Sequence, residues 1–394
     1  MKILFITHYD NLYGANKAMY KLISKLVDQK DYTPIVVIPA EGQFSSALEK
    51  MGVKVIINNV TQWQAMYAGF ARFMVKKHIR KKSFLAEVNE IYKKLQETGD
   101  LDIDLIHSNS SVVGTGAFLA RKIGCKHVWH IREFSKEHFS MKYFFGKGQV
   151  AQLYSEADCL IVISDALAEN YRNRYPKAHV VRVYDGVDAK EEGLNQPEIE
   201  KEQISDSKLA DEAANDYVFA YVGYLFEKKN QHQIIEACKI LKDQGIENYK
   251  VYIIGDGKDD YKNKLINLIE NYKLKDNVIL TGYVSDVDKF LSKANCGIIG
   301  SDYEGFGLVT VEYMLKGLPV LGKRSGATPE IVLDRETGLL YDNTEELADN
   351  MKTLMNDKKL GLHMGKKGLE RAKTCFSEES NAEQIINIYR ELSR

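Results

Sequence analysis

Two glutamates, Glu304 and Glu312, lie eight residues apart on either side of a glycine-rich turn. The turn, Glu-Gly-Phe-Gly at 304–307, follows an apolar run, Cys296–Ile299, that predicts a buried strand. It precedes a segment, Leu308–Leu315, whose apolar residues recur at helical spacing. Glycines let a backbone approach a ligand closely, and a helix start offers unpaired N–H groups and the positive end of the helix dipole. The turn therefore predicts a phosphate-binding site. The two carboxylates beside it are expected to accept hydrogen bonds from hydroxyl groups of the ligand.

Hydroxyl groups on both sides of a diphosphate are characteristic of a nucleotide sugar. The E-x7-E spacing, the E-G-F-G turn and the segment L-P-V-L-G…G-A-T-P-E-I-V at 318–332 resemble the GT-B glycosyltransferases of family 4, which are retaining enzymes that use nucleotide sugars. The resemblance implies that Glu304 faces the donor sugar as a catalytic residue and that Glu312 holds the ribose. It also implies that sugar and diphosphate meet the backbone amides of Gly305, Phe306, Gly307, Leu308 and Val309. The alternative is an ordinary strand-to-helix turn with surface glutamates.

Lys229 is a candidate cation for binding phosphate. It lies between another predicted strand, Tyr217–Gly223, and a helix that is expected to begin at Gln231. The segment between them resembles the family's G-R-L-x-x-x-K-G segment, in which an arginine and a lysine hold the diphosphate. Gly223 and Lys229 match the glycine and the lysine, whereas Tyr224 replaces the arginine. The resemblance implies that Gly223 belongs to the donor site and that Lys229, together with helix amides, neutralises the diphosphate and so acts in catalysis.

The loop after the first predicted strand is expected at the mouth of a site, because ligands bind at the carboxyl ends of parallel strands. There, Gly14, Ala15 and Asn16 resemble the family's G-G-A loop, with Tyr13 in place of the first glycine. The resemblance implies that these residues shape an acceptor site. The alternative is an ordinary strand-to-helix turn.

The sequence H-I-R-E at 130–133 follows a later predicted strand. A histidine there can hydrogen-bond a sugar hydroxyl or an acceptor group, and its pKa near neutrality suits both roles. The motif resembles a common form in the family, which implies that His130 faces the donor sugar or the acceptor and takes part in catalysis. Arg132 is a candidate for binding phosphate or an acceptor anion, with Glu133 as its expected pairing partner. The alternative for His130 is a structural role.

Strand-like runs alternate with helix-length segments, which predicts an α/β fold with parallel sheets. In the first half the runs are Ile3–Thr7, Ile35–Pro39, Val53–Ile57, Ile103–His107, His127–His130, Leu160–Ile163 and Val180–Val183. The resemblance implies the GT-B architecture, in which two doubly wound, Rossmann-like domains face each other across a cleft.

Residues 189–215 are rich in charged and polar residues and lack apolar periodicity, so a linker is expected there. We therefore expect an acceptor-binding domain at 1–188 and a nucleotide-sugar-binding domain at 216–377. The last segment, 378–394, predicts an amphipathic helix. The resemblance implies that this helix crosses back to the first domain.

The net charge of −1 hides an asymmetry between the two halves of the chain. Residues 1–185 carry 26 Lys and Arg against 18 Asp and Glu, and the rest carries 28 against 37. Within the basic half, the segment 66–95 combines aromatic residues at helical spacing with a cluster of lysines and arginines. Such a helix can lie on an anionic membrane surface. The alternative is an aromatic core face with a solvated basic face.

Several classes of protein are excluded by composition. No run approaches the ~18 apolar residues of a membrane span, and the amino-terminal apolar run is too short for a signal peptide. Five widely spaced cysteines without C-x-x-C spacing indicate neither disulfides nor a zinc site. The expected location is the cytoplasm, at the inner face of the membrane if the basic segment contacts lipid.

The resemblance implies a metal-independent hexosyltransferase without a cofactor. Its expected donor is a UDP-sugar, and its expected acceptor is a hydroxyl of a glycan or a lipid-linked molecule in the synthesis of cell-surface polysaccharide or glycoconjugate. Nucleic acid is not an expected partner. Two alternatives stay open: a UDP-sugar 2-epimerase of the same fold, and a non-catalytic protein that binds a nucleotide sugar and stabilises a transferase, which the missing arginine at Tyr224 would suit.

Overall fold

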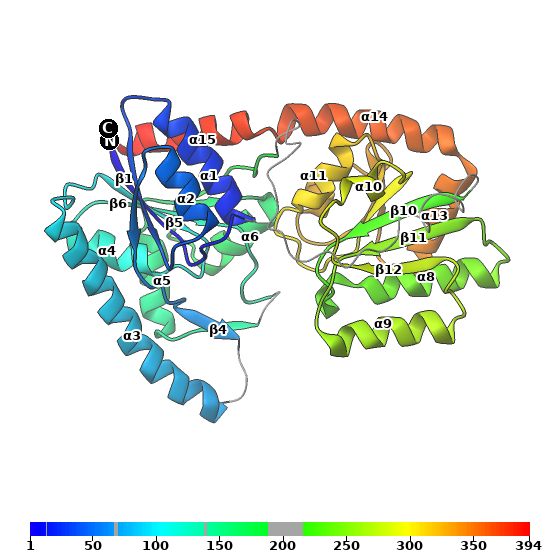
Figure 1. Ribbon diagram of the computed structural model, residues 1–394, viewed down its shortest axis with the longest axis horizontal. Coiled ribbons are helices and arrows are strands. Elements are labelled where there is room, and N and C mark those ends of the chain that lie inside the picture. The colour runs from blue at the N-terminus through cyan, green and yellow to red at the C-terminus, as the bar shows by residue number, and fades with distance from the viewer. Residues whose placement is uncertain (13, 67–69, 138–139, 188–215) are drawn as a thin grey trace. The chain divides into compact units, whose positions relative to one another are not determined.

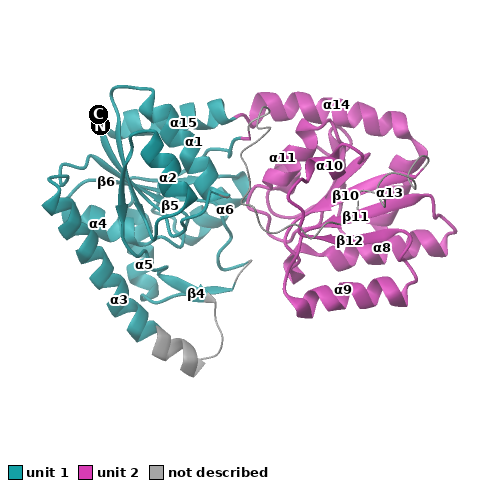
Figure 2. Ribbon diagram, in the orientation of Figure 1, with its two compact units in different colours: residues 1–186, 378–394 teal, residues 187–377 magenta. Residues whose placement is uncertain are grey.

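The computed structural model describes residues 1–12, 14–66, 70–137, 140–187 and 216–394, and for residues 66 and 70–76 it describes the backbone alone (Figure 1). The chain divides into two compact units (Figure 2). Unit 1 comprises Met1–Gly186 and Glu378–Arg394, and unit 2 comprises Val187–Ser377.

Unit 1 contains a parallel seven-stranded sheet in the order β3-β2-β1-β5-β6-β8-β9. Its strands are β1 (Lys2–Ile6), β2 (Thr33–Ile38), β3 (Lys54–Ile57), β5 (Leu105–Asn109), β6 (Lys126–Ile131), β8 (Cys159–Val162) and β9 (Val180–Arg182). A separate antiparallel ribbon pairs β4 (Gln64–Met66) with β7 (Met141–Tyr143). The helices are α1 (Ala15–Val27), α2 (Gln43–Lys50), α3 (Phe70–Glu97), α4 (Thr115–Ile123), α5 (Lys147–Glu156), α6 (Asp165–Arg174) and α15 (Glu378–Leu392).

Unit 2 contains a parallel six-stranded sheet in the order β12-β11-β10-β13-β14-β15. Its strands are β10 (Tyr217–Val222), β11 (Tyr249–Ile254), β12 (Val278–Gly282), β13 (Cys296–Ile299), β14 (Val320–Lys323) and β15 (Gly338–Tyr341). Its helices are η1 (Glu227–Lys229), α8 (Gln231–Asp243), α9 (Asp259–Asn271), α10 (Asp288–Leu291), α11 (Leu308–Leu315), α12 (Thr328–Ile331), α13 (Thr344–Asn356) and α14 (Lys358–Cys375).

Both sheets follow from the apolar runs of the sequence. The central strands β5, β8 and β13 are buried along their whole length, which is typical of parallel strands that helices cover on both faces. The expected α/β class with two Rossmann-like units is therefore confirmed. In each sheet the strand order reverses once, between β1 and β5 in unit 1 and between β10 and β13 in unit 2. Ligands of such sheets bind where the order reverses.

The last helix, α15, belongs to unit 1 and lies beside α1 (Figure 1). Its apolar face joins the core formed by β1, β2 and α1, through residues that include Ile385, Ile386 and Tyr389. A salt bridge of 3.4 Å between Lys21 and Glu378 supports its first turn. Within the described residues, no helix combines the length and apolar character needed to cross a lipid bilayer.

Candidate functional site

In unit 2, the reversal of strand order brings a lysine and a glutamate together. Lys229 is the last residue of η1, which follows β10, and Glu304 lies in the loop after β13. The Lys229 Nζ and Glu304 Oε2 atoms are 2.9 Å apart, and the two side chains are 25% and 16% exposed. The fold thus pairs two of the residues that the sequence singled out, although 75 positions separate them.

Hydrogen bonds on either side of Lys229 fix its loop against the neighbouring one. Asn230 donates from Nδ2 to the carbonyl oxygen of Gly300 at 2.9 Å. The amide of Asp302 donates to the carbonyl oxygen of Lys228 at 2.8 Å. The backbone at Lys229 is therefore held where its side chain reaches Glu304.

The downstream segment around Gly326 packs directly against the backbone of Glu304. The Ala327 amide donates to the Glu304 carbonyl oxygen at 2.9 Å. Gly326 has a φ of +56°, and a β-carbon there would lie 2.4 Å from the carbonyl oxygen and 2.5 Å from the nitrogen of Glu304. Only glycine allows this approach. The Gly-Ala-Thr-Pro-Glu sequence and the Glu-Gly-Phe-Gly turn are therefore parts of one structure.

The turn before α11 places backbone groups at the carboxyl end of β13. Gly307 has a φ of +90° and precedes the first residue of α11. Phe306 is buried, and its ring lies edge-on to that of Phe376 at 5.5 Å, so this side chain anchors the turn in the core. The remaining residues expected at the donor site are half-buried in and after the turn: Gly305, Leu308, Val309 and Glu312.

A cavity of about 430 Å³ lies at the carboxyl ends of β10, β11 and β12, and it is lined by Tyr224, Gly255, Asp256, Gly257 and Tyr283. Tyr224 and Tyr283 are 56% and 55% exposed. Exposed aromatic rings offer stacking surfaces to planar ligands. Gly223 lies beside this cavity, and its amide donates to the Ile254 carbonyl oxygen at 2.9 Å.

In unit 1, the segment 9–11 after β1 is held by the buried side chain of Asn16, in the first turn of α1. Thr7 Oγ1 donates to Asn16 Oδ1 at 2.6 Å, and Asn16 Nδ2 donates to the carbonyl oxygens of Tyr9 and Asn11 at 3.0 and 2.7 Å. These bonds occupy the amide of Asn16, so its side chain shapes the loop from within. Gly14 precedes α1, and Ala15 begins it.

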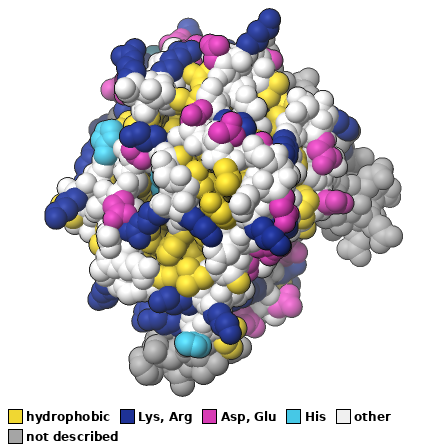
Figure 3. All heavy atoms as spheres, turned by 90° about the vertical axis from the view of Figure 1, so that its left-hand side faces the viewer, with side chains coloured by type: hydrophobic (Ala, Val, Ile, Leu, Met, Phe, Trp, Pro, Cys, Tyr) yellow, Lys and Arg dark blue, Asp and Glu magenta, His cyan; other side chains and the backbone are white. Residues whose placement is uncertain are grey.

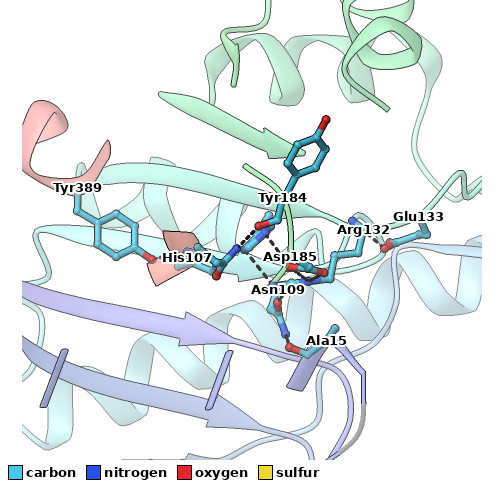
Figure 4. Close-up of polar contacts among 10 residues, drawn as sticks. Ala15, His107, Asn109, Arg132, Glu133, Tyr184, Asp185 and Tyr389 are labelled. Carbon is cyan, nitrogen blue, oxygen red and sulfur yellow. Dashed lines mark hydrogen bonds and ion pairs between the residues drawn. The ribbon is translucent and has the colours of Figure 1, made fainter. Parts of the chain in front are cut away.

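Arg132 lies at the centre of a buried polar cluster at the carboxyl ends of β5, β6 and β9 (Figure 4). Its Nε donates to Asp185 Oδ2 at 3.0 Å, and these side chains are only 9% and 3% exposed. Its Nη1 donates to Asn109 Oδ1, and Asn109 Nδ2 donates in turn to the carbonyl oxygen of Ala15 at 3.1 Å. The cluster therefore connects Arg132 to the loop that carries Ala15 and Asn16.

The expected pairing of the Arg132 side chain with Glu133 is wrong. Adjacent residues of an extended chain point to opposite sides, and the Glu133 carboxylate accepts hydrogen bonds from the hydroxyls of Ser110 and Ser111, each at 2.6 Å. Its contact with Arg132 is to the backbone amide, at 3.2 Å. Since Arg132 is buried and neutralised by Asp185, it is placed to organise the cluster.

His130 is fully buried beside Arg132. Burial, together with the nearby charge of Arg132, holds the pKa of its imidazole well below the usual value, so the ring is neutral. Arg132 Nη2 lies 3.2 Å from His130 Nδ1, and a guanidinium can only donate. His130 Nδ1 is therefore the acceptor and Nε2 carries the hydrogen. Nε2 has no hydrogen-bond partner among the described residues.

No group of three or more His, Cys, Asp or Glu is placed to hold a metal ion in the part of the chain that the structure describes. The geometry offers a cation, a carboxylate and helix-start amides in unit 2, and in unit 1 a buried network that contains the Arg132–Asp185 ion pair and neutral histidines. This combination suits the binding of an anionic, hydroxyl-rich ligand in unit 2.

Comparison with known families assigns both halves of the chain. The model described as Glycosyltransferase Family 4 matches residues 14–191, and the model described as Glycosyl transferases group 1 matches residues 202–371. The chain belongs to the GT-B glycosyltransferases of family 4. The resemblance inferred from the motifs is thereby confirmed.

This glycosyltransferase has relatives in archaea and bacteria. An uncharacterized glycosyltransferase of Methanocaldococcus jannaschii is 29% identical over 80% of this chain and 83% of its own. The N-acetylgalactosamine-N,N'-diacetylbacillosaminyl-diphospho-undecaprenol 4-alpha-N-acetylgalactosaminyltransferase of Campylobacter jejuni is 28% identical over 72% of this chain and 74% of its own. Anabaena HepE, solved in complex with UDP, shares the fold with a TM-score of 0.76 and 21% identity, covering 99% of this chain and all of HepE.

The sequence of this glycosyltransferase did not identify Asn109, Asp185 or His107 as members of the polar cluster around Arg132. Asn109 ends β5, and Asp185 follows β9. The available signal was positional, because polar residues at the carboxyl ends of parallel strands converge on one edge of the sheet. His107 lies within an apolar strand, so nothing in its local sequence separated it from the core.

Proposed function

We propose that this glycosyltransferase binds a UDP-sugar in unit 2 and transfers the sugar, with retention of configuration, to a hydroxyl of an acceptor. The observation that carries the proposal is the Lys229–Glu304 pair, 2.9 Å apart where the strand order reverses and next to the start of α11. In this proposal Lys229 neutralises the diphosphate, Glu304 faces the donor sugar and Glu312 holds the ribose.

The proposed chemistry is electrostatic. As the bond from the sugar to the diphosphate breaks, negative charge develops on the diphosphate and positive charge on the sugar. The ammonium of Lys229 and the amides at the start of α11 stabilise the leaving group, while the carboxylate of Glu304 stabilises the oxocarbenium-like sugar. The leaving diphosphate itself takes the proton of the attacking hydroxyl, and neither a cofactor nor a metal is assigned a role.

We place the base of the donor in the cavity between Tyr224 and Tyr283. Its volume of about 430 Å³ and its two exposed rings suit a planar base. The solved complex of HepE with UDP supports the choice of UDP. Tyr224 would thus supply a stacking surface where the family motif has an arginine, which leaves Lys229 as the main cation for the diphosphate.

For the acceptor we propose a lipid-linked molecule in the synthesis of cell-surface polysaccharide or glycoconjugate. The name of the Campylobacter relative describes an undecaprenol-linked acceptor, and the exposed basic part of α3 suits an anionic membrane. No acidic residue occurs between Phe70 and Ala86. Arg80, Lys81 and Lys82 are exposed.

The deciding experiment measures transfer from UDP-sugars to lipid-linked acceptors by Lys229→Met and Glu304→Gln. Each should lower kcat on the order of 100-fold, because each removes a charge that stabilises the transition state. Lys250→Met is the matched control, since Lys250 is a partly buried lysine paired with Asp216 at 3.8 Å, near the amino ends of β10 and β11. Nearly wild-type transfer by Lys229→Met would refute the proposed site.

The same assay separates the two alternatives. A UDP-sugar 2-epimerase would release free UDP and an epimerised sugar without any acceptor. A non-catalytic binding protein, which the absence of the arginine at Tyr224 favours, would raise its melting temperature with a UDP-sugar and turn over none of it.

A further inference from the structure

The apolar face of α15 contains two buried polar side chains. Asn381 is 7% exposed and Tyr389 is fully buried, whereas the other buried residues of the helix are Ala382, Ile385, Ile386 and Ile388. Packing alone could be achieved with apolar side chains. A buried polar group lowers stability unless it is hydrogen-bonded. The two polar positions therefore need an explanation of their own.

Both side chains reach the cluster around Arg132. Asn381 Nδ2 donates to the carbonyl oxygen of Tyr184 at 2.6 Å, and the next residue is Asp185. The Tyr389 hydroxyl shares a hydrogen bond of 2.6 Å with His107 Nδ1. Figure 4 shows Tyr389 and His107 on one side of the pair formed by Arg132 and Asp185.

The contact between Tyr389 and His107 continues to His130. The ring centroids of His107 and His130 lie 5.3 Å apart in an edge-to-face arrangement. Burial raises the pKa of the Tyr389 hydroxyl and lowers the pKa of His107, so both groups are neutral. A neutral imidazole carries one hydrogen, and the hydroxyl therefore helps to set which nitrogen of His107 bears it and how the ring lies against His130.

We propose that Asn381 and Tyr389 are positioning residues for the acceptor side of this glycosyltransferase. Asn381 holds the backbone that carries Asp185, and Tyr389 holds His107 against His130. The orientation of Arg132 then follows, because Asp185, Asn109 and His130 surround its guanidinium. Through Asn109 the effect extends to the carbonyl of Ala15 in the candidate acceptor loop. The inference deepens the proposed function and rests on it.

The kinetic test uses Tyr389→Phe, which removes the hydroxyl and keeps the ring. We expect kcat/KM for the acceptor to fall on the order of tenfold, with the KM for the donor and the melting shift on adding UDP unchanged, because unit 2 is untouched. Asn381→Ala should show the same separation between acceptor and donor. The matched control is Tyr249→Phe in unit 2, a fully buried tyrosine whose hydroxyl donates to the Cys238 carbonyl oxygen at 3.0 Å.

A second readout does not depend on turnover. In the chain with ¹⁵N-labelled histidine, Tyr389→Phe should move the ring-nitrogen signals of His107 and His130 and leave those of His8 and His127 in place. An inactive wild type would defeat the proposed function, and the spectra would then decide the positioning role alone.

Three results would overturn the inference. The first is an acceptor kcat/KM within about twofold of wild type in Tyr389→Phe. The second is an equal loss of acceptor kcat/KM in Tyr249→Phe, since a general loss of stability would then explain both variants. The third is a spectrum in which His107 and His130 keep their wild-type signals.

Discussion

Gly326 controls the position of Glu304 from 22 residues away. Gly326 has a φ of +56°, and an added β-carbon would lie only 2.4 Å from the Glu304 carbonyl oxygen. Any side chain at this position must therefore displace the backbone of Glu304. We predict that Gly326→Ala lowers the free energy of unfolding by about 2–4 kcal/mol, since it combines backbone strain with a steric clash. Transfer activity should fall with it, as Glu304 moves away from Lys229. Urea unfolding and steady-state kinetics measure the two effects.

Gly317 provides the control for this substitution. It has a φ of +71°, yet a β-carbon there would meet nothing within 4 Å. Gly317→Ala should therefore cost only the backbone term, about 1 kcal/mol, and leave kcat unchanged. Equal losses of stability and activity in the two variants would show that the contact with Glu304 is not the reason for the glycine.

At the residue scale, the sequence could predict the Lys229–Glu304 pair in unit 2 better than the cluster around Arg132 in unit 1. Lys229 and Glu304 stand in motifs with fixed neighbours, and each follows a strong strand signal. The partner of Arg132 is Asp185, 53 positions away, and local sequence carries no information on such a pair until the sheet order is known. The adjacent Glu133 was the only local candidate, and strand geometry turns it towards Ser110 and Ser111 instead.

At the element scale, α3 combines a buried face in its second half with a segment before it that is exposed all round the helix. Phe84, Val88, Ile91 and Leu95 are buried, so this part of the predicted aromatic face belongs to the core. Phe144 and Phe145, which lie between β7 and α5, are buried as well. The exposed segment at 78–83 contains Arg80, Lys81 and Lys82 together with Ile79, which is 63% exposed. Figure 3 views unit 1 from the left-hand side of Figure 1 and shows Lys and Arg side chains around apolar ones in the lower part of this surface.

We predict that this exposed basic segment binds anionic lipid. Each basic residue near an anionic surface contributes about 1 kcal/mol, so changing Arg80, Lys81 and Lys82 to Glu should abolish flotation with vesicles that contain acidic phospholipid. The control is the same reversal at Lys358, Lys359 and Lys366 of α14, which are also exposed. Wild-type chain that fails to float, or a triple α3 variant that floats as well as wild type, would contradict the prediction.

Most elements of the sheets could be read from the sequence, because parallel strands buried on both faces appear as short apolar runs between helix-length segments. All seven runs expected in the first half correspond to strands of the main sheet of unit 1. The ribbon of β4 and β7 was not predicted, since two three-residue strands joined across 75 positions leave no periodicity. The polar contacts of α15 were also missed, because its apolar spacing predicts a packed face without identifying what Asn381 and Tyr389 touch.

At the scale of the whole molecule, buried histidines distinguish the two units. His8, His107, His127 and His130 of unit 1 all have lowered pKa values, chiefly because burial disfavours the charged form. In unit 2 only His232, about half-buried, shows such a shift among the described residues. Both tryptophans of the chain, Trp63 and Trp129, are buried in unit 1. Tryptophan fluorescence therefore reports the unfolding of unit 1 alone.

We predict that unit 1 loses stability as the pH falls through about 6.5, the pKa of a histidine in an unfolded chain, at which half of such side chains are protonated. The folded state keeps these rings neutral. Between about pH 6.5 and the lowered pKa of each histidine only the unfolded chain takes up protons, so the unfolded state is favoured as the pH falls. For His127, whose pKa is lowered to about 3, the loss between pH 7 and pH 5 amounts to about 2 kcal/mol. Urea unfolding followed by tryptophan fluorescence at the two pH values measures the total. His127→Gln should remove about one proton from the pH slope, and a wild-type free energy of unfolding that is equal at both pH values would contradict the burial of neutral histidines.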